Sequence, residues 1–363
     1  MKLTQRDMMS ATELTRSGKL AEATALIQKM LGFNRSSNAD HDVDIASPIA
    51  PTIKKLARKA SPADVLKVAT SAKPKPKSSS AHFVTKDFAS THGKRSYKLF
   101  TPSQYEGQPL PLVVMLHGCS QSPDDFAVGT NMNVIAEEIG FFVAYPEQPS
   151  SANAMGCWNW FKSSDQKKDS GEPALITGIV REVIADHAVN QQKVYVAGLS
   201  AGGAMAAILG MTHPNLFAAI GVHSGLPCGA ATSMVGAFNA MKRGGSRVPT
   251  STSLHPVPTI VFHGDKDRTV DQVNSDDVIA QFDTTGAFNL STTETGKSAG
   301  GMEYSRLVYL QENGSPLFEQ WMVHGAGHAW SGGSTYGTYT EPRGPDASRE
   351  MIRFFFEHKL SLV

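Results

Sequence analysis

The stretch Val194-Tyr-Val-Ala-Gly198-Leu-Ser200-Ala-Gly202-Gly203 decides the fold of this 363-residue chain. Its first residues form an apolar run that predicts a buried strand, and the alanine-rich residues 201–211 predict a helix. A GlyXSerXGly sequence between a strand and a helix is typical of a nucleophile elbow. This turn is so tight that the positions flanking the serine have almost no room for a side chain, which explains the two glycines. We therefore expect Ser200 to stand clear of the sheet as a nucleophile.

Short apolar runs alternate with helical segments from His82 to the C-terminus. Such runs are typical of strands covered on both faces, and their alternation with helices indicates βαβ units. The sequence therefore predicts an α/β-hydrolase fold, with a mainly parallel central sheet and helices on both faces. The predicted strands cover residues 83–88, 97–100, 112–116, 141–145, 194–197, 218–223, 259–262, 304–309 and 318–323, and the predicted helices cover residues 132–139, 174–185, 201–211 and 348–358.

The residues before His82 predict two further parts of the chain. Residues 1–32 predict a helical hairpin, because the apolar residues of its second helix fall on one stripe. Residues 33–81 are rich in Ser, Pro and Lys and predict a flexible linker to the catalytic domain at 82–363. The apolar face of the hairpin needs a partner, which we expect to be the main domain, a second copy in a homodimer, or an apolar surface.

Composition and charge exclude several classes of partner. Lys and Arg number 34 and Asp and Glu number 33, a net charge of +1 that gives no field for recruiting nucleic acid. No apolar stretch approaches the ~20 residues that span a bilayer, and the N-terminus lacks the apolar core of a signal peptide. We therefore expect no membrane span and a cytoplasmic location. The sequence also has no metal-ligand spacing and no phosphate-binding GlyXXXXGlyLys motif, so we expect neither a metal nor a cofactor.

A serine nucleophile needs a base and a carboxylate that orients the base, and in this fold they follow in the order Ser, Asp, His. Residues 263–270 form an acidic loop after a predicted strand, where Asp267 is the expected carboxylate and Asp265 the alternative. The glycine-rich loop after the last predicted strand contains His328, which we expect to be the general base. His324 ends that strand, and we expect it to make a structural hydrogen bond.

The oxyanion that forms during ester cleavage needs two hydrogen-bond donors held in place. The residue after the nucleophile, Ala201, supplies one backbone amide in this fold. Gly118 permits a close turn after the predicted strand at 112–116, so the amide of Cys119 is the second candidate. Cys119 could also form a disulfide with Cys157, and the alternative is that these thiols are free and pack as small apolar side chains.

The motifs together resemble the polyhydroxybutyrate-depolymerase-like esterases, a family that includes feruloyl and acetylxylan esterases. The resemblance runs from about Phe83 to the C-terminus. It is carried by the motifs LeuHisGlyCys at 116–119, TyrProGluGln at 145–148, CysTrpAsnTrp at 157–160, GlyLeuSerAlaGly at 198–202, GlyLeuProCys at 225–228, HisGlyAspLysAsp at 263–267 and GlyHisAlaTrpSerGlyGly at 327–333.

The resemblance implies a catalytic triad of Ser200, Asp267 and His328, with Cys119 beside the oxyanion hole. It also implies an ester of a hydroxyalkanoic acid as the substrate, and it allows contact of the N-terminal hairpin with a polyester granule. Because many members of the family are secreted, an extracellular location is the alternative to a cytoplasmic one.

Three tryptophans near the motif loops are candidates for substrate contacts. Trp158, Trp160 and Trp330 could form an apolar wall for an acyl or polymer chain. Packing in the core is the alternative for Trp158 and Trp160, since bulky aromatic residues are often buried.

We therefore predict a serine esterase that works through an acyl-enzyme on short-chain polyhydroxyalkanoate, such as poly-3-hydroxybutyrate, or on its oligomers. The first alternative is a feruloyl or acetylxylan esterase, because the triad fixes the reaction while the pocket fixes the substrate. An alternative of another class is a non-catalytic, granule-associated scaffold.

Overall fold

The fold comes from a computed structural model that describes residues 81–245, 256–282, 289–311 and 314–360. The helical hairpin predicted for residues 1–32 lies outside the described residues, as does the predicted linker up to residue 80. Within the described residues, no helix combines the length and apolar composition needed to cross a membrane.

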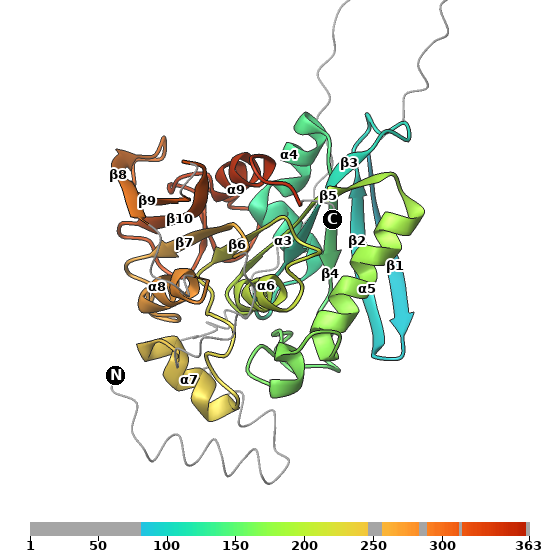
Figure 1. The fold of residues 1–363 in the computed structure, drawn as a ribbon, viewed down its shortest axis with the longest axis horizontal. Coiled ribbons are helices and arrows are strands. Elements are labelled where there is room, and N and C mark those ends of the chain that lie inside the picture. The colour runs from blue at the N-terminus through green and yellow to red at the C-terminus, as the bar shows by residue number, and fades with distance from the viewer. Residues whose placement is uncertain (1–80, 246–255, 283–288, 312–313, 361–363) are drawn as a thin grey trace, which may run out of the picture. The chain divides into compact units, whose positions relative to one another are not determined.

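The central sheet of the described part has ten strands in the order β1-β2-β4-β3-β5-β6-β7-β10-β9-β8 (Figure 1). The six strands from β4 to β10 in this order are parallel, while β1 and β2 at one edge and β9 and β8 at the other are antiparallel. The mainly parallel sheet predicted from the sequence is therefore confirmed. The strands are β1 (His82–Ser90), β2 (Gly93–Thr101), β3 (Leu110–Leu116), β4 (Phe142–Pro146), β5 (Val189–Leu199), β6 (Ala219–His223), β7 (Thr259–Gly264), β8 (Asn289–Lys297), β9 (Glu303–Leu310) and β10 (Pro316–Val323), with a separate small pair of β11 (Trp330–Ser331) and β12 (Thr340–Glu341).

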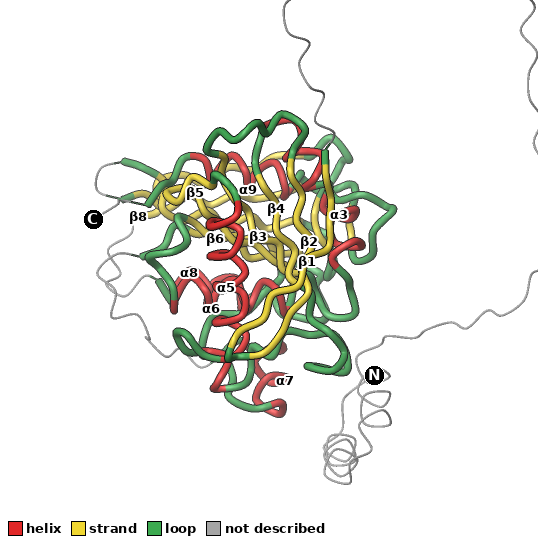
Figure 2. Tube along the Cα trace, turned by 90° about the vertical axis from the view of Figure 1, so that its right-hand side faces the viewer, coloured by secondary structure: helices red, strands yellow, loops and turns green. Residues whose placement is uncertain are grey.

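Helices cover both faces of the sheet, as the sequence predicted. α5, α6 and α8 pack on one face and α4 and α9 on the other. Figure 2 shows the strands as one layer, with α5 and α6 on one side and α3 on the other. The helices are α3 (Pro123–Thr130), α4 (Met132–Ile139), α5 (Gly171–Asp186), α6 (Ala201–Thr212), α7 (Met234–Arg243), α8 (Val273–Ala280) and α9 (Ala347–Phe356), with a 3₁₀ turn at Ser163–Gln166.

The alternation of side chains along β3 shows why this central strand is apolar throughout. Leu112 and Val114 point into the core under α5 and α6, whereas Val113 and Met115 point into the core under α4 and α9. Because successive side chains of a strand lie on opposite faces, a strand covered on both sides needs apolar residues at every position. The two cores hold the sheet rigid where its carboxyl ends carry the candidate site.

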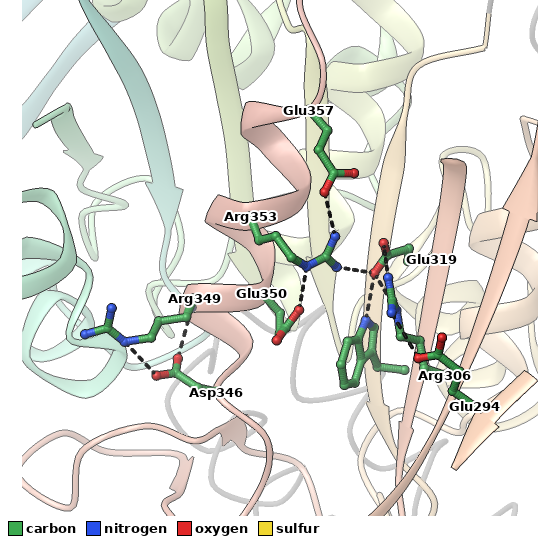
Figure 3. Close-up of polar contacts among 9 residues, drawn as sticks. Glu294, Arg306, Glu319, Asp346, Arg349, Glu350, Arg353 and Glu357 are labelled. Atoms are coloured by element: carbon green, nitrogen blue, oxygen red, sulfur yellow. Dashed lines mark hydrogen bonds and ion pairs between the residues drawn. The ribbon is translucent and has the colours of Figure 1, made fainter. Parts of the chain in front are cut away.

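The antiparallel edge of the sheet is joined to α9 by a buried carboxylate. The fully buried side chain of Glu319 in β10 accepts hydrogen bonds from Arg306 of β9 at 2.7 Å and Arg353 of α9 at 2.6 Å (Figure 3). The indole of Trp321 donates a third bond at 3.1 Å. Burial alone would raise the pKa of Glu319, but the two guanidinium groups hold it below its ordinary value. The cluster therefore ties three elements together through one ionised group.

Glu319→Gln is expected to lower the free energy of unfolding by about 3 kcal/mol, because breaking a buried ion pair leaves uncompensated charge. Urea unfolding at pH 7 measures this. The matched control is Glu294→Gln, which removes an exposed ion pair with the same Arg306 and should change stability by less than about 1 kcal/mol. Since the folded-state pKa of Glu319 is lowered, its contribution is present above the unfolded pKa and lost as the pH falls through the folded one. Equal losses in the two variants would contradict this account.

Candidate active site

The turn at Ser200 has the geometry of a nucleophile elbow. Ser200 lies between β5 and α6 with φ 57° and ψ −117°, a backbone conformation that residues other than glycine rarely adopt. Its backbone N–H donates to the carbonyl of His223 at 2.9 Å, which fixes the turn against β6. A Cβ atom at Gly198 would overlap the backbone of Gly202, and one at Gly202 would overlap the carbonyl of Leu116. The two glycines are therefore required by the close approach of β3, β5 and α6.

The loop after β7 holds the side chain of Asp267 in one orientation. Its Oδ1 accepts hydrogen bonds from the backbone N–H groups of Thr269 at 2.8 Å and Val270 at 2.9 Å. Its Oδ2 is 2.6 Å from Nδ1 of His328, in the loop after β10. The carboxylate is fully buried and the His328 side chain is 12% exposed. The predicted carboxylate and the predicted base are thus joined directly.

The charge of Asp267 determines which nitrogen of His328 carries the proton. Burial alone would raise the pKa of Asp267, but the hydrogen bond and charge of His328, with the charge of His263, hold it below its ordinary value. An ionised carboxylate only accepts hydrogen bonds, so Nδ1 of a neutral His328 is the donor and Nε2 has a free lone pair. Within the described residues, Nε2 makes no hydrogen bond. It is therefore available to accept a proton.

Two buried histidines lie beside the pair. Burial and the nearby histidines lower the pKa of His223 to about 3, and burial also lowers that of His263. His263 donates through Nε2 to the carbonyl of Val270 at 2.9 Å and lies 3.6 Å from Oδ2 of Asp267. Burial therefore disfavours the charged form of both rings. The sequence predicted no role for either histidine, although both stand at the ends of predicted strands.

The strand order places Ser200 on the same edge of the sheet as the other two residues. β5, β6, β7 and β10 are successive neighbours, and the three residues follow the carboxyl ends of the first, third and fourth. His223 links the loops, because its carbonyl accepts from Ser200 and its Nε2 accepts from the N–H of Ser331 at 3.0 Å. Ser200 and His328 share no hydrogen bond in the described structure, and such bonds are often long before substrate binds.

The other acidic residue of the loop, Asp265, has a different partner. Its carboxylate contacts Nδ1 of His324 at 3.1 Å and the N–H of Gly325 at 2.7 Å. Nε2 of His324 lies 2.8 Å from the hydroxyl of Ser305. Both polar atoms of the His324 ring are therefore engaged, in agreement with the structural hydrogen bond expected for it.

The loop after β3 brings Cys119 to the edge of the sheet that carries Ser200. Leu116 of β3 pairs with Gly198 of β5, so Cys119 and Ala201 follow neighbouring strand ends. A disulfide joins Cys119 to Cys157, with Cα atoms 4.2 Å apart, which decides between the two alternatives left open by the sequence. Cys228 is a free thiol whose pKa burial raises to about 12. Within the described residues, the backbone amides of Cys119 and Ala201 donate no hydrogen bond.

The structure does not support the predicted apolar wall of tryptophans. Trp158 is 0% exposed and donates from its indole to the carbonyl of His117 at 3.1 Å. Trp330 is 1% exposed and donates to Ser348 at 3.0 Å, while Trp160 is also buried. All three rings lie in the two cores, where large aromatic side chains bury the most apolar area. They offer almost no surface to a substrate.

A mainly parallel sheet with a nucleophile elbow, a carboxylate and a histidine at the carboxyl ends of its strands defines an α/β-hydrolase. The chain belongs to the family described as esterase PHB depolymerase, which matches residues 95–303, more than half of the sequence. It is 33% identical over 229 residues to a poly(3-hydroxyalkanoate) depolymerase C of Paucimonas lemoignei, covering 60% of this chain and 54% of that protein. It is 26% identical over 217 residues to a probable acetylxylan esterase A of Aspergillus fumigatus, covering 55% and 57%. The chain thus spans about half the length of these relatives.

Among solved structures, the fold is similar to that of an acetyl xylan esterase from Aspergillus awamori. The TM-score is 0.60, and the match covers 76% of this chain and 99% of the other. At 18% sequence identity, this similarity supports the α/β-hydrolase fold alone.

Proposed function

We propose that this chain is a serine esterase that cleaves carboxylic esters through an acyl-enzyme, with Ser200, His328 and Asp267 as its catalytic residues. The observation that carries the proposal is the 2.6 Å contact between Nδ1 of His328 and the buried carboxylate of Asp267. It fixes the tautomer that leaves Nε2 free to take a proton. A non-catalytic scaffold has no need of a buried, ionised carboxylate that orients a histidine at the end of a sheet.

The first half of the reaction forms the acyl-enzyme. Oγ of Ser200 attacks the ester carbonyl carbon while Nε2 of His328 accepts the hydroxyl proton. The carbonyl oxygen becomes an oxyanion that accepts hydrogen bonds from the backbone N–H groups of Cys119 and Ala201. As the C–O bond to the alcohol breaks, His328 gives its proton to the leaving oxygen.

The second half releases the acid. His328 takes a proton from a water molecule, whose oxygen attacks the acyl carbon, and then returns that proton to Ser200. The N-terminus of α6 faces the site with its free amides and favours the negative charge of both tetrahedral intermediates. Asp267 stabilises the positive His328 in both halves without taking up its proton.

The substrate we propose is a short-chain hydroxyalkanoate ester, as a polymer or an oligomer. Support comes from the relative named poly(3-hydroxyalkanoate) depolymerase C, which has the higher identity of the two relatives compared. Because the other relative is named an acetylxylan esterase, an acetyl ester is the alternative substrate. The cytoplasmic location, the homodimer and the contact with a granule remain predictions.

Two measurements test the proposal. A fluorophosphonate that reacts with activated serines should label one peptide, which contains Ser200 and is identified by mass spectrometry. Hydroxybutyrate oligomers, polymer film, methyl ferulate and acetylated xylan should then be compared at equal enzyme concentration, with release of hydroxybutyrate fastest. Faster turnover of acetylated xylan or methyl ferulate would move the substrate to the alternative class, whereas labelling at another residue would reject Ser200 as the nucleophile.

A further inference from the structure

In the loop that carries Cys119, the backbone N–H groups on both sides of Cys119 donate hydrogen bonds. The N–H of Gly118 donates to Oε1 of Gln121 at 2.9 Å, and the N–H of Ser120 donates to the carbonyl of Met155 at 2.8 Å. Between them, the N–H of Cys119 has no acceptor among the described residues. One donor of this loop is therefore left free, next to the elbow of Ser200.

The ring of His117, directly before this loop, contacts the peptide group that contains the free donor. Its Nδ1 lies 2.8 Å from the carbonyl oxygen of Gly118, and its Nε2 lies 3.1 Å from the backbone nitrogen of Gln148. His117 is 1% exposed and its ring packs beside that of Trp158, with 5.7 Å between centroids. The ring is thus held by the core and cannot turn away.

The two contacts fix the position of the proton on His117. A backbone N–H can only donate, so Nε2 must accept from Gln148 and carry no proton. Burial lowers the pKa of His117, so the ring is neutral at pH 7 and has a single N–H. That N–H must be on Nδ1, where it donates to the carbonyl of Gly118.

This hydrogen bond controls the direction of the Cys119 amide. The carbonyl of Gly118 and the N–H of Cys119 belong to one planar trans peptide group and point in opposite directions. When His117 holds the carbonyl on the core side, the N–H must point to the other side. The N–H of Gln121 is a weaker second donor to the same carbonyl, at 3.3 Å.

We propose that His117 is a positioning residue of the oxyanion hole, which holds the Gly118–Cys119 peptide group so that the Cys119 amide faces the reacting carbonyl of the ester. The inference rests on the proposed esterase function and assigns a role to a residue that does not touch the substrate. The disulfide of Cys119 anchors its side chain, but a peptide group next to a glycine can still rotate. The ring of His117 removes that freedom.

Two substitutions separate the two hydrogen bonds of the ring. His117→Asn places an amide NH₂ near the position of Nδ1, so it keeps the bond to Gly118 and loses the bond to Gln148. His117→Gln places its amide near the position of Nε2, so it can accept from Gln148 and does not reach Gly118. The two variants lose one bond each, and thermal unfolding should show similar losses of stability.

The measured quantities are kcat and KM for a short p-nitrophenyl ester, and the inhibition constant of a trifluoromethyl ketone that adds to Ser200. His117→Gln should lower kcat about 10- to 100-fold, less than the loss of a whole donor. The same variant should raise the inhibition constant of the ketone by a similar factor and leave KM within about twofold. The reason is that the oxyanion exists only in the ketone adduct and in the transition state, not in the bound substrate. His117→Asn should keep kcat within about threefold of the wild type.

A wild-type kcat in His117→Gln, or equal losses of kcat in the two variants, would overturn the inference. If His117→Gln does not fold, His117→Asn decides, since a kcat reduced more than about tenfold in a folded protein contradicts the assigned role. Labelling of wild-type Ser200 by the fluorophosphonate keeps the two proposals apart. With labelling intact, a negative result rejects only the role of His117, whereas absent labelling rejects the nucleophile itself.

Discussion

Ser200→Ala is expected to lower kcat for a short p-nitrophenyl ester by about 10⁴- to 10⁶-fold, because no other group can form the acyl-enzyme. The fold should remain, since the structure gives the Ser200 hydroxyl no hydrogen bond among the described residues. The strained backbone at this position is set by β5, α6 and the two flanking glycines, which the substitution leaves in place. Steady-state kinetics and thermal unfolding of the same preparation measure both effects.

Ser233→Ala is a matched control for this prediction. The Ser233 hydroxyl caps α7 by accepting from the N–H of Gly236 at 3.2 Å. Its loss should reduce stability by about 1 kcal/mol and leave kcat unchanged. Ser200→Ala should therefore lose activity and keep its stability, whereas Ser233→Ala should lose stability and keep its activity. Residual turnover above about 1% in Ser200→Ala would show that Ser200 is not the nucleophile.

The sequence was sufficient for the parts of the fold that are buried on both sides. β3, β5 and β7 contain apolar runs, and the carboxyl ends of β5 and β7 carry Ser200 and Asp267 of the candidate site. The predicted helix at 132–139 has the bounds of α4, because its apolar residues recur at helical spacing. An element that is buried on both faces accepts mainly apolar residues, so its apolar pattern is easy to recognise in the sequence.

The elements that were missed have weak patterns for physical reasons. β8 is a polar strand at the edge of the described sheet, where it pairs with β9, so backbone hydrogen bonds define it rather than alternating apolar residues. α8 is short and buries polar residues such as Asn274 and Ser275, which hides its period. α3 and α7 are also short helices, for which packing against the domain outweighs local preference.

At the site, the order of motifs predicted candidate residues but could not give their contacts. The choice of Asp267 over Asp265 depends on which carboxylate meets His328, a contact between loops 61 residues apart. The disulfide depends on the 4.2 Å approach of Cα atoms 38 residues apart. The tryptophans near the motifs face the cores because of the direction of their side chains, which closeness in the sequence does not reveal.

Asp267→Asn should have the second largest effect, a loss of about 10⁴-fold in kcat. Two backbone N–H groups, those of Thr269 and Val270, donate to Oδ1 of Asp267. The asparagine must therefore place its carbonyl oxygen there and turn its NH₂ toward Nδ1 of His328. Nδ1 then has to accept, which moves the proton of a neutral His328 to Nε2. In that tautomer the ring cannot take the proton of Ser200, although every side chain remains in place.

Asp265→Asn provides the matched control, because it makes the same chemical change in the same loop. Asp265 contacts His324 and Gly325 rather than His328. Its substitution should keep kcat within about threefold, while thermal unfolding shows that both variants are folded. If the two variants lost activity equally, the loss of kcat would result from a disturbed loop and not from the tautomer of His328. If Asp267→Asn kept its activity, the carboxylate at position 267 would have no part in orienting the base.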